Sequence, residues 1–277
     1  MPVDDHSISK EHFNLCRCND CDFIFTQDVP TENDAGPYYK SEEYISHSNT
    51  NKGLVNKLYH IVREHMLSKK HQLIAGLQQG KTILDVGAGT GYFLNYMKQQ
   101  GYETLGIEID ADARAHGQKE FGLDIRPPKD LKEGLIDKKF DTISLWHVLE
   151  HLYNPETYLQ HFYNVLQDNG HLIIALPNAD SYDANRYKSY WAAYDVPRHL
   201  WHFTPKTLEK LANDNGFKLE KMKDLPFDPF YNAMLSEKYK NNSLALISGG
   251  FVGLRSLLKG KMDVRKASSV IYVLKKK

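Results

Sequence analysis

Two imidazoles and a carboxylate stand close together in residues 144–152, which read SLWHVLEHL. His147, Glu150 and His151 follow directly after an apolar run. If this stretch is helical, positions i, i+3 and i+4 share a face, and the three side chains gather there. An imidazole can accept a proton near neutral pH, and imidazoles with a carboxylate can also bind a divalent metal. The same residues could instead only stabilise the fold.

The overall composition is that of an ordinary globular protein. The chain has 277 residues, of which 25% are charged and 41% hydrophobic, and this suits a large α/β domain with appendages. Lys+Arg and Asp+Glu are equal at 35 each, which argues against a dedicated nucleic-acid-binding protein. No apolar run reaches the roughly 20 residues of a membrane-spanning helix. The N-terminus lacks the apolar core of a signal peptide, so we expect a cytoplasmic protein.

All three cysteines lie in one short segment, CRCNDC, as Cys16, Cys18 and Cys21. Cys18 and Cys21 have the spacing of one half of a zinc-ribbon site, whereas a closed zinc site needs four ligands. A nearby histidine could supply one more. We therefore expect either zinc at an incomplete knuckle or a knuckle without metal.

Strand and helix patterns alternate through most of the chain. Short apolar runs predict strands, and apolar residues three or four apart predict helices. The predicted strands span residues 82–87, 103–110, 123–125, 140–146, 171–178, 217–223 and 269–275. The predicted helices span residues 92–101, 111–122, 154–167 and 204–216, with one or two helices at 53–80 and an apolar helical stretch at about 231–258. Right-handed crossovers then give a parallel sheet with helices on both faces.

The first predicted strand ends in a glycine-rich loop, DVGAGTG, which contains Asp85, Gly87, Gly89 and Gly91. Glycines allow a tight turn and let backbone N–H groups approach a ligand. Glu108 ends the second predicted strand, where a carboxylate can accept hydrogen bonds from both ribose hydroxyls. Loop and carboxylate together predict a nucleoside-binding site.

Two common nucleotide loops do not match this one. A P-loop ends in Gly-Lys-Ser/Thr, whereas this chain has Gly91, Tyr92 and Phe93. The dinucleotide fingerprint needs its third glycine at position 92. An NAD-dependent oxidoreductase is therefore an alternative that Tyr92 argues against, and a non-catalytic cofactor-binding interaction module is another.

The Gly-x-Gly-x-Gly loop preceded by Asp85 resembles the first motif of class I S-adenosylmethionine-dependent methyltransferases. Further segments look like successive motifs of one family of bacterial small-molecule methylases, which is similar to the ubiquinone-type O-methyltransferases and carries an N-terminal Cys-x2-Cys knuckle. These segments are CNDCDFIFTQDVP, YYKSEEY, GYFLNYMK, FDTISLWHVLEHLYNP, HLIIALPN and PRHLWHFTPKTLEKLANDNGF. The resemblance implies a Rossmann-like, seven-stranded, mostly parallel sheet with an antiparallel last strand and an N-terminal helical lid.

The resemblance also implies which residues contact S-adenosylmethionine. Glu108 would bind the ribose, Ile109 would cover the adenine, and Trp146 and His147 would lie beside the sulfonium. The full implied set is Asp85, Gly87, Ala88, Gly89, Gly91, Glu108, Ile109, Trp146 and His147.

Three parts of the chain are expected. They are a partial zinc-ribbon-like knuckle at 1–30, a lid and helix at 31–80, and a methyltransferase domain at 81–277 with a helical insertion at about 225–266. Tyr38, Tyr39 and Tyr44 would lie in the lid over the cofactor, or else simply pack.

The expected reaction is methyl transfer to an oxygen, or less readily a carbon, of a small-molecule acceptor. His147 or His199 could be the general base. Alternatively, Glu150 and His151 could bind a divalent metal together with His147 and either His199 or His202. That arrangement resembles the Glu-x-x-Glu-His site of some ubiquinone-type and small-RNA methyltransferases, with His147 in place of the first glutamate.

Arg198 is a further candidate for the acceptor site. It could bind a carboxylate or phosphate of the substrate, or it could pair with Asp195 or Asp183 instead. The C-terminal stretch at 225–266 combines apolar and basic residues. It could contact a membrane surface or a lipid-like acceptor, cover the sheet, or form a dimer contact, so both a monomer and a homodimer are open.

Overall fold

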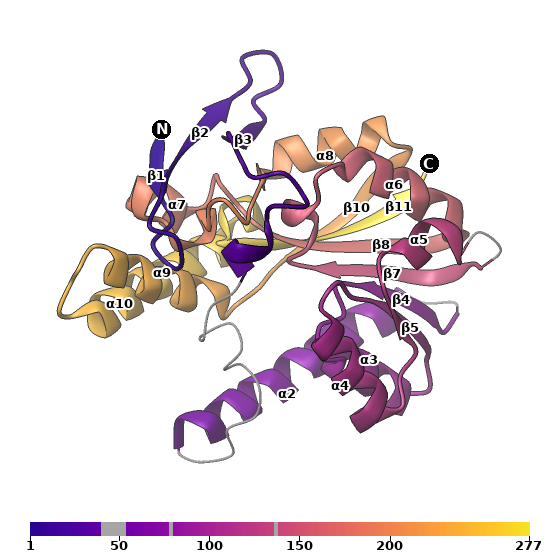
Figure 1. Cartoon of the computed structure of the whole chain (residues 1–277). Coiled ribbons are helices and arrows are strands. Elements are labelled where there is room, and N and C mark those ends of the chain that lie inside the picture. Colours follow the sequence, from indigo (N-terminus) through magenta and orange to yellow (C-terminus); the bar gives the residue numbers. More distant parts are fainter. Residues whose placement is uncertain (40–53, 78–79, 136–137) are drawn as a thin grey trace.

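The computed structural model describes residues 1–39, 54–77, 80–135 and 138–277, and Tyr44 lies outside them. The described residues form a sheet of seven strands and a sheet of four, with helices packed around the larger one (Figure 1). The larger sheet confirms the predicted Rossmann-like architecture.

Seven strands form the larger sheet, and they are β4 (Thr82–Val86), β5 (Glu103–Ile107), β6 (Ile125–Arg126), β7 (Phe140–Trp146), β8 (Leu166–Pro177), β10 (Phe217–Asp224) and β11 (Ser269–Lys276). Their order across the sheet is β10-β11-β8-β7-β4-β5-β6. Strand β4 pairs in parallel with β5 on one side and β7 on the other, so the chain changes direction across the sheet at β4. Strand β11 is antiparallel to both its neighbours, which confirms the predicted reversal. Strand β8 begins earlier than predicted, because Leu166 already pairs with Phe140 of β7.

The helices have the bounds α2 (Leu54–Ala75), α3 (Tyr92–Gln99), α4 (Ala111–Phe121), α5 (Lys129–Glu133), α6 (Pro155–Val165), α7 (Tyr182–Tyr187), α8 (Pro205–Asp214), α9 (Asp228–Tyr239) and α10 (Ala245–Met262). Short 3-10 helices are η1 (Gly36–Tyr39), η2 (Leu149–His151), η3 (Lys188–Tyr190), η4 (Ala192–Tyr194) and η5 (Val264–Lys266). Thr204 forms a capping box with Thr207 at the start of α8, as its sequence predicts. The two short helices α5 and α7 were not expected from the sequence.

Both faces of the larger sheet are buried, and β8 shows how. Leu172 and Ile174 pack into the core that includes side chains of α6 and α8. Ile173 and Ala175, which point the opposite way, pack into the core that includes side chains of α2 and α3. The sheet is therefore packed between two hydrophobic cores, and the residues at the carboxyl ends of its strands have fixed positions.

The smaller sheet consists of β1 (Pro2–Asp4), β2 (His12–Arg17), β3 (Ile24–Gln27) and β9 (Trp201–His202), paired antiparallel in that order. The expected knuckle at 1–30 is thus joined to a strand from far along the chain. Thr26 Oγ1 donates to the backbone carbonyl of His199 at 2.8 Å. The N-terminal strands therefore help to fix the position of His199.

Among the helices that the structure describes, none is long and apolar enough to span a bilayer.

Candidate functional site

The glycine loop lies between the end of β4 and the start of α3, and its three glycines have left-handed backbone conformations. The φ angles of Gly87, Gly89 and Gly91 are 76°, 53° and 86°. A Cβ at Gly87 would lie 2.3 Å from Cγ2 of Val148, whereas a Cβ at Gly89 would meet nothing within 4 Å. Gly87 is therefore a packing requirement, and Gly89 faces open space.

Glu108 follows β5 and reaches back to this loop. Its Oε2 accepts a hydrogen bond from the backbone N–H of Gly89 at 2.7 Å, and its Oε1 accepts one from the N–H of Asp110 at 2.9 Å. Each carboxylate oxygen keeps a second lone pair for a hydroxyl. The side chain of Ile109 is 76% exposed beside it. A carboxylate next to an exposed apolar side chain fits a ribose and its base.

Asp85, which is buried at the end of β4, interacts electrostatically with Lys70, a half-buried residue of α2. Asp85 accepts a hydrogen bond from Ser144 Oγ at 2.5 Å, and burial raises the pKa of Asp85 to about 7. Burial lowers the pKa of Lys70 to about 8, although Asp85 and Asp228 act against this. The Nζ of Lys70 lies 4.0 Å from the ring centroid of Trp146. The buried indole N–H of Trp146 has no acceptor among the described residues.

His147 stands between two carboxylates. Its Nε2 lies 3.2 Å from Asp228 Oδ2, and its Nδ1 lies 3.5 Å from Glu150 Oε1. Burial acts to lower the pKa of His147, but Asp228 and Glu150 outweigh it and raise the pKa to about 10. His147 is therefore an imidazolium near neutral pH, and in this state it cannot accept a proton.

The helix assumed for residues 144–152 is not formed. Strand β7 ends at Trp146, His147 has a φ of 58°, and only Leu149–His151 forms a short 3-10 helix. Because the strand continues to position 146, a tight turn rather than a helix follows it and connects it to the segment that leads into α6. The side chains of His147 and Glu150 meet across this turn rather than on a helix face.

Glu150, His151 and His199 form a convergent group with one donor atom each, all within 4.8 Å of one another. Neither carboxylate oxygen of Glu150, which is buried, has a hydrogen-bond partner among the described residues. His151 Nδ1 lies 3.0 Å from the carbonyl oxygen of Arg198, and His199 Nδ1 lies 2.9 Å from that of Ala193. Because a carbonyl only accepts, we assign a proton to Nδ1 in both rings, so that Nε2 is the atom each ring turns toward another partner.

The charges of this group suit a metal ion. Burial acts to raise the pKa of Glu150, but the imidazolium of His147, 3.5 Å away, outweighs it and holds the pKa below its ordinary value, so Glu150 is ionised. Burial and His199 lower the pKa of His151 to about 4, so its ring is neutral. A tetrahedral site with bonds of about 2.1 Å has donors about 3.4 Å apart. The Nε2 of His199 lies 4.0 Å from the Oε1 of Glu150, and the three donors lie within 4.8 Å of one another, so they would move closer together on binding an ion and leave a fourth position open.

Other predicted residues lie apart from this group. His202 Nε2 is 2.9 Å from Thr26 Oγ1, and burial lowers the pKa of His202 to about 3. Arg198 pairs with Asp195 at 2.6 Å and with Asp5 at 3.0 Å. Its sequence-predicted alternative role, a salt bridge to Asp195, is the contact that the structure contains. Arg198 thus anchors the N-terminal strands beside the site.

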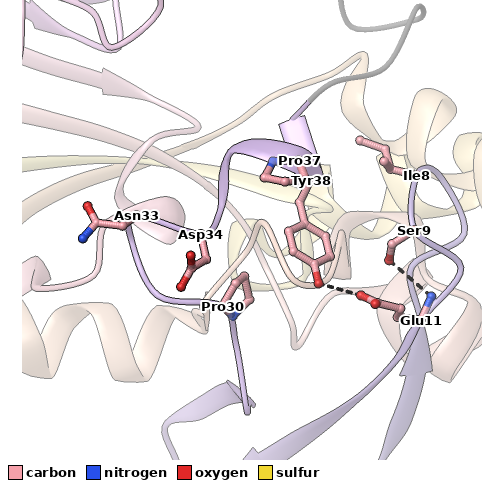
Figure 2. A pocket seen from close by; sticks show the side chains of 8 residues that line it. All are labelled: Ile8, Ser9, Glu11, Pro30, Asn33, Asp34, Pro37 and Tyr38. Atoms are coloured by element: carbon pink, nitrogen blue, oxygen red, sulfur yellow. Dashed lines mark hydrogen bonds between the residues drawn. The ribbon is translucent and has the colours of Figure 1, made fainter.

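The two described lid tyrosines point in different directions. The hydroxyl of Tyr39 lies 3.3 Å from His151 Nδ1. Tyr38 instead donates to Glu11 Oε2 at 2.6 Å, in the wall of a cavity of about 620 Å³ (Figure 2). That cavity is lined by Ile8, Ser9, Glu11, Pro30, Asn33, Asp34, Pro37 and Tyr38, and it contains no residue of the glycine loop. Only Tyr39 therefore reaches the site.

Two of the three cysteines, Cys18 and Cys21, lie close enough for a side-chain hydrogen bond, whereas Cys16 has a different partner. Cys16 lies on β2, and its thiol donates to Gln27 Oε1 at 3.1 Å. Cys18 and Cys21 lie in the connection between β2 and β3. Of the groups of His, Cys, Asp and Glu in the described chain, only that of Glu150 has three donors gathered. Zinc at the knuckle stays a prediction.

Sequence reasoning missed two residues of the site, Lys70 and Asp228. Lys70 lies on α2 and Asp228 begins α9, so both come from segments distant from the motifs. The sequence contains signals for the two helices: the apolar spacing in α2 and the Asp-Pro pair at the start of α9. Neither signal indicates that the helix contacts β7.

Comparisons with known proteins agree with this geometry. Residues 59–222 match the model of a family described as a methyltransferase domain. The mitochondrial ubiquinone biosynthesis O-methyltransferase of Rattus norvegicus is 31% identical over 166 residues, which cover 54% of this chain and 48% of that protein. The corresponding enzyme of Alkalilimnicola ehrlichii is 26% identical over 197 residues, which cover 66% of this chain and 77% of that protein. The chain thus spans about half the length of the rat relative.

A solved structure shows the same fold. Magnesium protoporphyrin IX methyltransferase from Synechocystis PCC 6803, with bound SAH (S-adenosylhomocysteine), superposes with a TM-score of 0.56 at 14% identity, covering 87% of this chain and 97% of that chain. At this identity the likeness is one of fold alone. Because the family model matches more than half of the sequence, this chain belongs to the methyltransferase domain family.

Proposed function

We propose that this chain transfers a methyl group from S-adenosylmethionine to an oxygen of a small-molecule acceptor. The observation that carries the proposal is the open space at Gly89 beside the paired carboxylate of Glu108. Both lie at the carboxyl ends of parallel strands where the strand order changes direction, which is where ligands bind in open α/β sheets.

The residues around this space fit the cofactor. Glu108 would accept hydrogen bonds from the ribose hydroxyls, and the exposed side chain of Ile109 would be covered by the adenine. Lys70 supplies a cation under the loop that suits the carboxylate of the methionine part. Trp146 presents an aromatic face and an unpaired N–H at the end of β7. These features favour S-adenosylmethionine over a dinucleotide.

The group of Glu150, His151 and His199 fits a divalent metal, and we propose that it binds one. Two imidazoles with one carboxylate suit Zn²⁺ or a similar transition metal better than Mg²⁺. When bound, such an ion lowers the pKa of a coordinated hydroxyl. The backbone carbonyls of Arg198 and Ala193 orient the two rings toward the acceptor site.

The chain's own residues also position and shield the reaction. The ion pair of His147 and Asp228 fixes the start of α9 against the end of β7. Tyr39 reaches over His151 from the N-terminal side. Bringing acceptor and donor together and excluding water is most of what methyl transfer requires, because the sulfonium supplies the leaving group.

The acceptor that we favour is a phenolic hydroxyl. The relatives reported above are named for ubiquinone biosynthesis and for O-methylation. A phenol has a pKa of about 10, and a bound metal ion would help to remove its proton. Transfer to carbon is the second candidate.

The first experiment is a binding measurement. Calorimetric titration of the purified chain with S-adenosylhomocysteine and, separately, with NAD should show binding of the former only. Binding of NAD alone would refute the proposal.

The second experiment measures metal content and turnover together. Glu150→Gln should remove the copurifying metal and lower methyl transfer to a catechol probe by about a hundredfold or more. Glu156→Gln, an exposed glutamate at the start of α6, is the matched control and should change neither. If Glu150→Gln keeps its metal and its activity, the metal site is wrong, whereas the cofactor assignment is judged by calorimetry alone.

A further inference from the structure

The helix α10 packs against the protein through its small residues. Those that are buried are Ala245, Gly249, Gly253, Ser256 and Gly260. A Cβ at Gly249 would lie 2.6 Å from Cα of Met234, and one at Gly253 would lie 2.8 Å from Cα of Phe230. Both of these partners belong to α9, so the two helix backbones are in close contact. The buried face of α10 is fully used by this packing.

Five large apolar residues of α10 lie on the opposite face. They are exposed by between 46% and 81%, and they are Ile247, Phe251, Leu254, Leu258 and Met262; Leu246, 69% exposed, lies to one side of them. Their spacing of three or four residues places them along one side of the helix. We call these five residues the apolar stripe. A surface helix normally buries its large apolar residues and exposes small or polar ones, and α10 does the reverse.

Positive charges border the apolar stripe. Helix α10 contains Arg255, Lys259 and Lys261 and no acidic residue. Their helical positions place Arg255 and Lys259 on one side of the stripe and Lys261 on the other. Lys261 pairs with Asp224, whereas Arg255 and Lys259 have no ion-pair partner in the part of the chain that the structure describes.

We propose that α10 docks this protein on an anionic phospholipid membrane. The apolar stripe would enter the boundary between headgroups and acyl chains, and its cationic borders would meet the lipid phosphates. Helix α10 lies at the edge of the molecule beyond α9, where the docked helix would leave the sheet in water (Figure 1).

Charge favours a lipid surface over a second copy of the chain. A symmetric dimer pairs the same patch on both copies, so the unpaired cations of one stripe would meet those of the other with no carboxylate from α10 between them. An anionic bilayer instead supplies the opposite charge along the whole helix. The charge complementarity therefore selects the membrane.

The docking surface is directly connected to the site. Asp228, the first residue of α9, pairs with His147, and α10 packs directly against α9. Docking through α10 would place the carboxyl edge of the sheet near the bilayer. An acceptor with an apolar tail could then reach the site without leaving the lipid.

The test is sedimentation of the full chain with lipid vesicles. We expect the wild-type chain to sediment with vesicles of equal parts phosphatidylcholine and phosphatidylglycerol and much less with phosphatidylcholine alone. Phe251→Glu should weaken this binding by about tenfold or more. Ile61→Glu is the matched control, because Ile61 is 66% exposed and Phe251 67%, and it should bind like the wild type.

A second variant tests the electrostatic part. Replacing Arg255 and Lys259 with glutamine should weaken binding to the anionic vesicles by about fivefold per charge and leave residual binding to phosphatidylcholine unchanged. Circular dichroism and thermal unfolding of each variant would confirm that it is folded. All these measurements are independent of methyl transfer.

Three results would overturn the proposal. The first is a wild-type chain that stays in solution with both kinds of vesicle. The second is equal vesicle binding by the Ile61→Glu and Phe251→Glu variants. The third is a wild-type dimer, seen by light scattering, that Phe251→Glu converts to monomers while neither form binds vesicles. That outcome would assign the apolar stripe to a second copy.

Discussion

Two alanine substitutions in the glycine loop separate packing from ligand binding. In Gly87→Ala the new Cβ would lie 2.3 Å from Val148 Cγ2, at a residue with φ 76°. The left-handed backbone contributes about 1 kcal/mol and the overpacking about 1–3 kcal/mol, so the free energy of unfolding should fall by about 2–4 kcal/mol. In Gly89→Ala the φ is 53° and the Cβ meets nothing within 4 Å, so only the backbone effect of about 1 kcal/mol remains.

For the affinity for S-adenosylhomocysteine, the product of the cofactor, we expect the reverse order: Gly89→Ala should have the larger effect. The Cβ of Gly89→Ala would occupy the space in which the nucleoside is proposed to lie. We expect the affinity for S-adenosylhomocysteine to fall by more than about tenfold, which corresponds to about 1.4 kcal/mol. Urea unfolding gives the stability of each variant, and calorimetric titration gives its affinity.

Either of two outcomes would refute the reasoning. If Gly89→Ala binds S-adenosylhomocysteine as the wild type does, the open space at Gly89 is not the ligand site. If Gly89→Ala loses as much stability as Gly87→Ala, the assignment of the two glycines to different roles is wrong.

The buried charges give three further predictions. Asp5→Asn should lower the free energy of unfolding at neutral pH by about 2 kcal/mol. Hydrogen bonds, among them one from Arg198, hold the pKa of Asp5 below its ordinary 3.8, so this stabilisation is present above that pH and is lost as the pH falls. Urea unfolding at neutral and acidic pH should therefore show the wild type and variant converging in acid. Lys70→Met should weaken S-adenosylhomocysteine binding by about tenfold, while calorimetry with 5′-methylthioadenosine, which lacks the carboxylate, should show a change within about twofold. Asp183→Ala should lower the free energy of unfolding by about 3 kcal/mol or more, because three buried donors lose their acceptor; Asp180→Ala, on the surface, is the control in the same unfolding assay.

Local sequence signals were sufficient for the elements of the larger sheet. The stretch at 140–146 forms β7 with the predicted bounds. Thr204 followed by Pro205 begins α8 as a cap and first-turn proline should. These signals act within one turn or one strand, so a single sequence contains them.

Contacts between distant segments were beyond those signals. The pairing of β3 with β9 joins residues far apart in the chain, and so does the ion pair of His147 with Asp228. Both depend on how the finished sheet places its connections. The left-handed backbone of His147 is likewise set by the tight turn after β7, because residues other than glycine seldom adopt this conformation without such a constraint.

The candidate site shows the same division. The types and spacing of Glu150 and His151 marked two members of the proposed metal group, and His199 was one of two histidines left open as a partner. His147, which was expected in the same group, lies outside it and pairs with Asp228. The choice between His199 and His202 depended on the smaller sheet, in which His202 is held by Thr26. The sequence also could not predict which face of α10 is exposed, because an apolar pattern shows which residues share a face and not which face is buried.

The most direct test of the account is a crystal structure of this chain with S-adenosylhomocysteine. The account predicts that both ribose hydroxyls lie within hydrogen-bonding distance of the Glu108 carboxylate, that the adenine covers Ile109, and that the amino-acid part crosses Gly89. A nucleoside bound elsewhere, or a ribose that makes no hydrogen bond to Glu108, would contradict it.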